Sequence, residues 1–194
     1  MPLALLSLIL ALLVPSLAFA AAGKVTFLSG SVERVPKDGA PVALALDGEV
    51  EQGDTIRTGP DSRVQLALVD GSVLRLNERS VLRLDRIEQR AGEKSWQVKL
   101  QMALGAVWAR VAPRESEAPR FEIGSDRVVA GVRGTQFIVQ ADEAHTVVVL
   151  EGAVDVAGAS GQKLGAQDAW SLLPQTAIVV DREGKTEGVI GIDG

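Results

Sequence analysis

The residues that most often carry nucleophilic, acid–base and metal chemistry are nearly missing from this chain. Its 194 residues contain no cysteine, no tyrosine and a single histidine, His145. Disulfides, thiolate nucleophiles and cysteine-ligated zinc are therefore excluded, and one histidine cannot make a multi-histidine metal site. His145 follows Asp142 and Glu143 in a polar link between two apolar runs, so we predict a solvated loop histidine without a catalytic role.

The serines and carboxylates do not form a catalytic set either. Ser62, Ser72 and Ser80 have no histidine partner in the sequence, and Asp142 and Glu143 lie in a polar loop typical of solvated surface rather than of a raised-pKa acid. The recurrent aspartate–glycine spacing of calcium β-rolls is also missing. We therefore predict a protein that is not an enzyme and that uses no cofactor or metal.

Tryptophans are the remaining candidates for ligand recognition. Trp96 and Trp108 lie within strand patterns, which favours core packing or an amphipathic rim over a binding role. Trp108, Arg110 and Trp170 are the candidate binding surface, because exposed indole rings can serve as platforms on which sugars stack. If Trp108 and Trp170 share one exposed face, a glycan or peptidoglycan site gains weight.

Residues 1–22 carry no charged side chain and indicate an export signal. Leu3–Leu17 is an almost unbroken apolar run that closes on the alanine-rich segment 18–22. The pattern predicts a signal peptide cleaved after Ala20 or Ala22, and hence a periplasmic or secreted protein. About 20 apolar residues can also span a bilayer, so an uncleaved membrane anchor is the alternative.

Every charge lies in the remaining segment, which has the length of one domain. Its 20 basic residues are scattered among 25 acidic ones, and the net charge is −5. Without a cationic stripe, nucleic acid is excluded as an expected partner. The acidic balance also disfavours simple adsorption to anionic lipid.

Alternation of apolar and polar residues governs this segment. In Val64–Leu68, Leu74–Leu76 and Leu82–Leu84, an apolar side chain recurs at every second residue, which predicts half-buried strands with leucines on one face. Helical periodicity is nearly absent, so the predicted fold class is all-β. Further strands are predicted at Val25–Val35, Val42–Leu46, Trp96–Leu100, Val107–Val111, Phe121–Ile123, Val128–Val132, Gln136–Val139, Thr146–Leu150, Val154–Val156 and Ala177–Val180.

A weak repeat places glycine and a small residue before valine three times, at Gly30–Val32, Gly105–Val107 and Gly152–Val154. The unequal separations argue against a strict solenoid, which has a fixed period. We predict a β-solenoid-like or rolled stack of short strands, with a glycine at each tight corner. A β-sandwich or jelly roll is the alternative, in which strands pair as antiparallel hairpins.

Four phrases together resemble the FecR domain, the envelope-facing domain of bacterial iron-responsive signalling regulators: Gly53–Gly59, Leu66–Leu76, Val132–Val139 and Leu150–Val154. The resemblance covers residues 23–180 and implies a β-solenoid-like roll, with 181–194 as a C-terminal tail. We interpret the motif residues as structural: Gly53, Asp54, Gly59, Asp70, Gly71, Gly134, Thr135, Phe137 and Gly152. At Gly134 the chain must turn or bulge, which predicts a positive φ or a close backbone approach.

Those regulators carry a cytoplasmic, sigma-factor-binding region and a membrane helix before this domain, whereas only the leader precedes it here. The resemblance therefore implies the extracytoplasmic β domain without the cytoplasmic anti-sigma region. We expect a non-enzymatic binding, scaffold or signal-sensing module that contacts other proteins of the bacterial cell envelope. The alternative is a glycan- or peptidoglycan-binding module that uses exposed tryptophans. A membrane contact is expected only if the leader stays uncleaved.

Overall fold

The computed structural model describes residues 21–89, 96–113, 121–165, 167–186 and 188–192. Strands dominate this part of the chain, and its helical element is the single 3₁₀ turn η1, Ala159–Gly161. The all-β prediction is confirmed. The predicted leader lies outside the described residues, apart from Ala21 and Ala22, which belong to the first strand.

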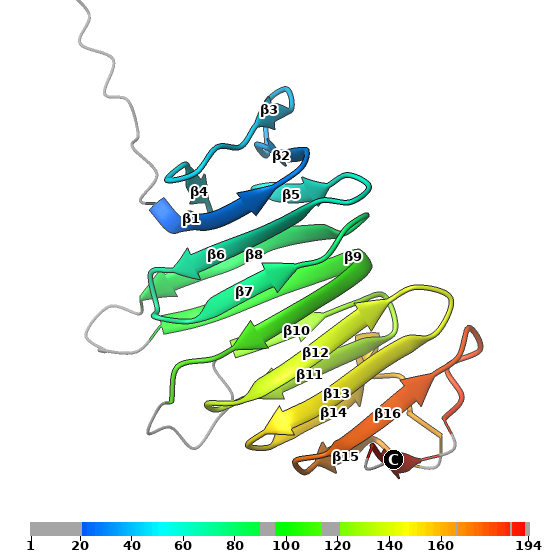
Figure 1. Ribbon diagram of the computed structural model, residues 1–194. Coiled ribbons are helices and arrows are strands. Elements are labelled where there is room, and N and C mark those ends of the chain that lie inside the picture. Colours follow the sequence, from blue (N-terminus) through cyan, green and yellow to red (C-terminus); the bar gives the residue numbers. More distant parts are fainter. Residues whose placement is uncertain (1–20, 90–95, 114–120, 166, 187, 193–194) are drawn as a thin grey trace, which may run out of the picture.

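The strands form one large, unclosed sheet that folds into two faces, here called sheet A and sheet B. Sheet A contains, in spatial order, β4 (Glu49–Glu51), β1 (Ala21–Ser29), β6 (Arg63–Leu68), β7 (Val73–Leu76), β9 (Trp96–Arg110), β12 (Gln136–Ala141), β13 (His145–Glu151), β16 (Thr176–Val180) and β17 (Val189–Gly191). Sheet B contains β3 (Val42–Ala43), β2 (Val32–Val35), β5 (Thr55–Thr58), β8 (Val81–Gln89), β9 again, β10 (Phe121–Gly124), β11 (Val128–Val132), β14 (Val154–Gly158) and β15 (Ala169–Leu172). The chain advances along one axis, from β1–β5 in the upper part of Figure 1 to β15 and β16 at the bottom.

Strand β9 joins the two sheets. The sequence predicts two strands here, Trp96–Leu100 and Val107–Val111, but β9 runs unbroken for 15 residues. Its first part pairs with β8 and β10 in sheet B, and its second part pairs with β7 and β12 in sheet A. The change of sheet occurs at Gly105, whose φ of +82° is accessible to glycine at little cost.

The strand pairings are antiparallel among the described residues, except that β9 and β10 run parallel. Successive hairpins are added on alternate faces, so that β6–β7 lies in sheet A, β10–β11 in sheet B and β12–β13 in sheet A. A solenoid with parallel rungs is not identified in the described part of the chain. The strands advance in chain order, but they pair as hairpins, which was the property expected of the sandwich alternative.

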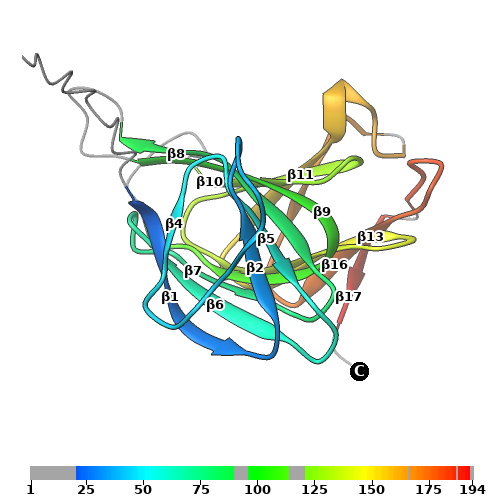
Figure 2. The same ribbon diagram turned by 90° about the horizontal axis from the view of Figure 1, so that it is seen from above.

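The core lies between the two faces. Figure 2 shows β8, β10 and β11 on one side and β6, β7 and β16 on the other. The predicted leucine face is confirmed, because Leu66, Leu74 and Leu82 are fully buried. Leu66 and Leu74 are neighbours in the β6–β7 hairpin, whereas Leu82 belongs to β8 in sheet B. Their equal spacing in the sequence therefore does not place all three in one sheet.

Several strands carry no clear sequence signal. Strands β4, β5, β15 and β17 are three or four residues long, too short to show an alternating pattern. Strand β17 lies within the segment 181–194 that the sequence predicts as a tail, and it pairs with β16. Among the residues described, no helix has the length and apolar character needed to cross a membrane.

Candidate functional site

A row of apolar residues crosses the outer face of sheet A. Outward and inward side chains alternate along each strand, and the register sets the outward ones side by side. The row, called the apolar row below, consists of Trp108, Ile138, Val148, Ala177 and Ile190, each opposite the next on the neighbouring strand. Trp108, Ile138 and Val148 are half-buried, and the small Ala177 is buried between its neighbours. Ile190, on the last strand, is 49% exposed.

The outer face of sheet B is charged instead. Lys99 and Glu122 occupy neighbouring outward positions, with Nζ 3.8 Å from the carboxylate, and Arg133 lies 3.8 Å from Asp155. Exposed ion pairs of this kind contribute little to stability, but they keep a surface solvated. The two faces of the molecule thus differ in character, and the apolar row belongs to one of them.

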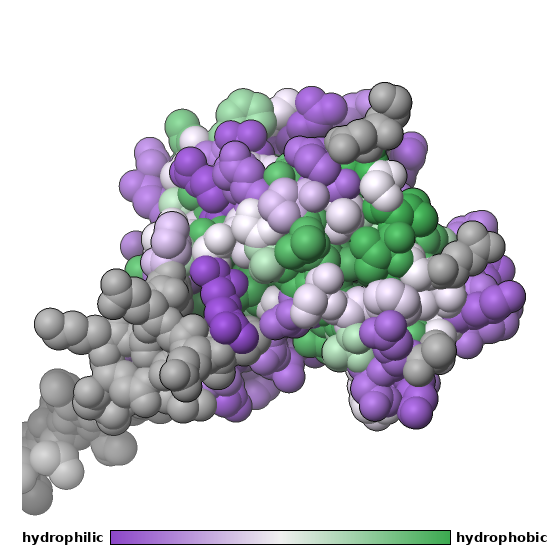
Figure 3. Space-filling model, turned by 90° about the horizontal axis from the view of Figure 1, so that it is seen from below, coloured by the Kyte–Doolittle hydropathy of each residue, from purple (hydrophilic) through white to green (hydrophobic). Residues whose placement is uncertain are grey.

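Apolar surface continues from the row to the C-terminal end of the stack. Figure 3 views the molecule from this end and shows apolar residues gathered across the middle of the face. The exposed apolar side chains of this region are Leu173, Val179, Val189, Ile190 and Ile192. Strand β17 forms the edge of sheet A here, with no partner on its far side among the described residues.

The sequence-predicted binding residues are only partly brought together. Trp108 and the exposed Arg110 point outward from the same strand, and the guanidinium of Arg75 lies 4.7 Å from the centre of the Trp108 ring, a cation–π contact. Trp170, on β15, lies opposite the buried Val156 of β14 and packs against the core. Its indole N–H donates to the main-chain carbonyl of Leu164 at 3.1 Å. Trp108 and Trp170 therefore belong to different sheets and share no exposed face.

His145 is not solvated, and this part of the sequence interpretation was wrong. The residue is 4% exposed and lies opposite Ala141 at the start of β13. Its inward direction follows from alternation, because His145, Val147 and Val149 occupy every second position of the strand and are all buried. That spacing was the available signal, and the polar residues before His145 obscured it.

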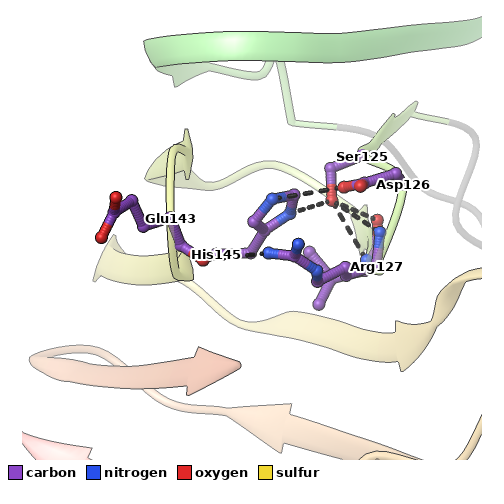
Figure 4. Close-up of polar contacts among 6 residues, drawn as sticks. Ser125, Asp126, Arg127, Glu143 and His145 are labelled. Carbon is purple, nitrogen blue, oxygen red and sulfur yellow. Dashed lines mark hydrogen bonds and ion pairs between the residues drawn. The ribbon is translucent and has the colours of Figure 1, made fainter. Parts of the chain in front are cut away.

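Burial brings His145 against the turn between β10 and β11. Figure 4 shows its ring facing Ser125 and Asp126, with Nδ1 2.7 Å from Ser125 Oγ and Nε2 3.2 Å from Asp126 Oδ1. Burial lowers the pKa of His145 below its ordinary value; Asp126 opposes this shift and Arg127 adds to it. Sequence reasoning missed Ser125, which lies 20 residues away and meets His145 only in the folded chain.

This serine–histidine–aspartate contact does not have the geometry of a hydrolase site. Ser125 is 4% exposed, and its Oγ already accepts the N–H groups of Arg127 at 3.2 Å and Val128 at 3.1 Å. A nucleophile needs room for a substrate and donors aimed at a developing oxyanion, and this hydroxyl is enclosed in its own turn. No cluster of three or more metal-ligating side chains occurs in the described ranges.

The family is decided by comparison with known sequences. A family model described as FecR protein matches residues 54–155, more than half of the chain. The chain belongs to the FecR family. No curated protein matches the sequence.

This FecR-family chain is similar in structure to a candidate anti-sigma factor from Parabacteroides distasonis. A crystal structure of that protein at 2.50 Å resolution superposes with a TM-score of 0.53 at 25% identity, covering 70% of this chain and 57% of the other. A second crystal structure, at 1.65 Å, gives a TM-score of 0.52 at 24% identity with the same coverage. The FecR-family chain thus spans little more than half the length of the protein it matches.

The motif residues of this FecR-family chain lie at strand corners or in the core. Asp54 is 3% exposed, and its Oδ2 accepts the main-chain N–H of Glu51 at 2.8 Å and Arg34 Nη1 at 3.2 Å. Asp70 accepts the N–H of Ser72 at 2.9 Å, which closes the β6–β7 turn. The remaining motif positions are Gly53, Gly71, Gly134 and Gly152 with positive φ, Gly59 and Thr135 bonded at corners, and Phe137 in the core.

Gly134 and Thr135 form one such corner. Gly134 has a φ of +101°, and a Cβ added to it would lie 2.8 Å from the Cα of Pro113. Thr135 donates its hydroxyl to the carbonyl of Ala153 at 3.1 Å. The backbone thus has both properties that the sequence led us to expect at this position, and its contacts are internal.

Replacing Gly134 with valine should lower the free energy of unfolding by at least about 1–3 kcal/mol, the backbone strain of a non-glycine residue. The close contact of the added Cβ with Pro113 Cα, at 2.8 Å, adds to this loss. Chemical denaturation of the wild type and the variant measures the difference. Because the contacts of this corner are internal, binding of any partner should fall only in proportion to the folded fraction. A variant of unchanged stability that had lost its partner would make the corner a binding site.

Proposed function

We propose that this FecR-family chain is a non-enzymatic binding module of the bacterial cell envelope, which acts in signal sensing or scaffolding by holding another protein. The apolar row across sheet A is the observation that carries the proposal. Aromatic and aliphatic side chains gathered on one outward face are typical of protein-contact surfaces, whereas singly exposed apolar residues are ordinary.

The partner that suits this surface is a protein segment in extended conformation. The apolar row ends at Ile190 on β17, and all three residues of that strand are exposed and uncharged. Two other sheet edges are protected, since β4 carries Glu49 and Glu51 and β3 follows directly after Pro41. A partner strand added beside β17 would continue both the hydrogen bonding and the apolar row.

An envelope location is part of the same proposal. The uncharged leader supports export to the periplasm or the outside of the cell. Of the two cleavage positions, the one after Ala20 leaves β1 whole. Ala22 is buried, and its carbonyl accepts the N–H of Val69 at 3.1 Å, so a cut after Ala22 would remove a core residue.

The support for a role in a sigma-factor circuit is the similarity to a solved structure. The structure matched at 25% identity is a candidate anti-sigma factor, and this chain corresponds to part of it. The glycan alternative has lost its geometric support, because Trp108 and Trp170 do not share a face. The basic residues are scattered along the sequence, and on the outer face of sheet B Lys99 and Arg133 are paired with carboxylates, which does not favour nucleic acid.

Val148→Asp tests the proposal at the centre of the apolar row. A charge there should weaken partner binding at least tenfold, because desolvating an unpaired carboxylate in an apolar contact is costly. The matched control is Val129→Asp on the outer face of sheet B, also a half-buried valine. A photo-crosslinking residue at position 138, with one at position 129 for comparison, would capture the partner from the envelope for identification.

The binding constant of the identified partner is then measured with both variants after circular dichroism has established that they are folded. Equal losses for Val148→Asp and Val129→Asp, or crosslinks only from position 129, would refute the apolar row as the contact surface. Sedimentation with purified peptidoglycan provides the competing measurement. Co-sedimentation that Trp108→Ala abolishes in a folded protein would replace the protein partner with a glycan.

A further inference from the structure

His145 connects two hairpins that belong to different sheets. The imidazole is on β13 in sheet A, and its partners Ser125 and Asp126 are on the β10–β11 turn of sheet B. A second contact reinforces this bridge, in which Arg127 Nη1 donates to the main-chain carbonyl of Glu143 at 3.1 Å (Figure 4). The turn of one hairpin is thereby fastened to the start of the next.

The hydrogen bonds of Ser125 indicate which protonation state of His145 fits the contact between the two hairpins. Ser125 Oγ accepts two main-chain N–H groups, which occupy both lone pairs of a hydroxyl. Its own proton can go to Nδ1 of His145 at 2.7 Å or to the Val128 carbonyl at 3.4 Å, and the shorter distance favours Nδ1. With the hydroxyl donating to Nδ1, that nitrogen is unprotonated and the ring's single proton lies on Nε2, 3.2 Å from Asp126 Oδ1.

A second proton on the ring conflicts with this arrangement. Protonated Nδ1 becomes a donor and points at a serine oxygen that has no free lone pair. Ser125 would have to give up an N–H bond of the turn, and its hydroxyl would keep only the longer bond to the Val128 carbonyl at 3.4 Å. Either the contact between the two hairpins or the bonding within the turn is then lost.

We propose that His145, Ser125 and Asp126 form an acid-sensitive latch, closed while the imidazole is neutral and loosened when it takes up a proton. Loosening frees the β10–β11 turn from β13. Asp126 and Arg127 also line a polar hollow of about 490 Å³ with Lys163 and Arg182, so release of the turn reshapes that hollow. A domain exposed to the pH outside the cell would sense acid in this way.

The charged groups around the ring and its burial set the pKa of His145, and hence the pH at which the latch loosens. Burial holds the pKa of His145 below the ordinary 6.5, Asp126 and Asp142 raise it, and Arg127 lowers it. Beyond β16, Arg182 is paired with Glu143 at 2.9 Å. The pKa of His145 is lower in the folded chain than in the unfolded chain, so at a pH between the two values the unfolded chain binds a proton that the folded chain does not. The free energy of unfolding therefore falls as the pH drops below about 6.5.

The chain offers a clean measurement because His145 is its only histidine. NMR titration of the imidazole C–H protons should give a midpoint below pH 6.5. Amide protection factors at Arg127 and Val128, corrected for the intrinsic exchange rate, should fall by up to about tenfold per pH unit within the titration, as expected when one proton opens the turn. Protection at Leu66, remote in β6, should stay unchanged.

Three variants separate the latch from a merely buried histidine. His145→Asn keeps an acceptor for the serine hydroxyl but cannot titrate, so the protection at the turn should no longer depend on pH between 5.5 and 7.5. Ser125→Ala should raise the pKa of His145 because the conflict over the hydroxyl is gone, and Asp126→Asn should lower it because a favourable charge is removed. If His145→Asn does not fold, the other two variants still test the proposal through the predicted directions of the pKa change of His145.

The proposal would be overturned by a wild-type midpoint at or above pH 6.5. Protection at Arg127 and Val128 that follows that of Leu66 through the titration would also overturn it, since the proton would then not act on the turn. An unchanged pKa in Ser125→Ala would remove the serine from the latch. These measurements need no partner, so they are independent of the proposed binding function.

Discussion

Phe137→Ala should destabilise the protein by about 3–5 kcal/mol, the range found when a large buried aromatic is truncated and its cavity cannot collapse. Phe137 is fully buried in β12, where it lies opposite Ala109 on one side and Val149 on the other. Two small or medium neighbours cannot fill the volume that the ring leaves. Urea denaturation followed by tryptophan fluorescence measures the effect.

Phe27→Ala is the matched control for Phe137→Ala. Phe27 belongs to β1 of the same sheet but is 51% exposed, so its truncation should change the free energy of unfolding by no more than about 0.5 kcal/mol. Similar losses for the two variants would mean that the core does not lie between sheets A and B. Phe137→Leu should fall between them because it removes less volume.

Gly105→Val should lower the free energy of unfolding by about 2–6 kcal/mol, as the sum of backbone strain and a steric clash. The φ of +82° strains any residue with a Cβ by about 1–3 kcal/mol. The added Cβ would also lie 2.3 Å from Ser80 Oγ and 2.7 Å from Ser80 Cα, an overpacking that costs about another 1–3 kcal/mol. The clash also displaces the Ser80 hydroxyl that accepts the N–H of Ala106 at 3.1 Å.

Two other glycines separate the parts of that cost. Gly161 has a φ of +74° with no atom within 4 Å of an added Cβ, so Gly161→Val should show the strain alone. Gly191 has neither a positive φ nor a close neighbour, so its valine variant should be nearly neutral. Thermal or chemical unfolding of the three variants should therefore give the order Gly105, Gly161, Gly191. A Gly105→Val variant no less stable than Gly161→Val would exclude the steric part.

The corner repeat shows what local sequence can predict. Gly30, Gly105 and Gly152 were predicted at tight corners, and their φ values are +79°, +82° and +79°. A glycine before a small residue and a valine is a local signal, because the backbone conformation it permits depends on that residue alone. The buried leucines of β6, β7 and β8 were predictable for a similar reason, since alternation within one strand determines which side chains share a face.

The candidate sites could not be predicted in the same way. Ile138 and Val148 are half-buried in strands that are apolar on both faces, so the sequence does not tell which side chains point outward. Their alignment with Trp108 depends on the register of three strands. Ser125 and His145 meet because a turn in sheet B packs against a strand in sheet A, and no local pattern encodes that contact.

By itself, the sequence determined the fold class, the leucine core, the corner glycines and the resemblance to the FecR domain, because each follows from local periodicity or from a short motif. Only the tertiary structure decided that β9 passes from one sheet to the other, that hairpins rather than parallel rungs build the stack, and that Trp108 and Trp170 lie apart. It also placed the single histidine in the interior. These features arise from register and from packing between strands distant in the chain, where the interaction of two segments, and not the preference of either, sets the outcome.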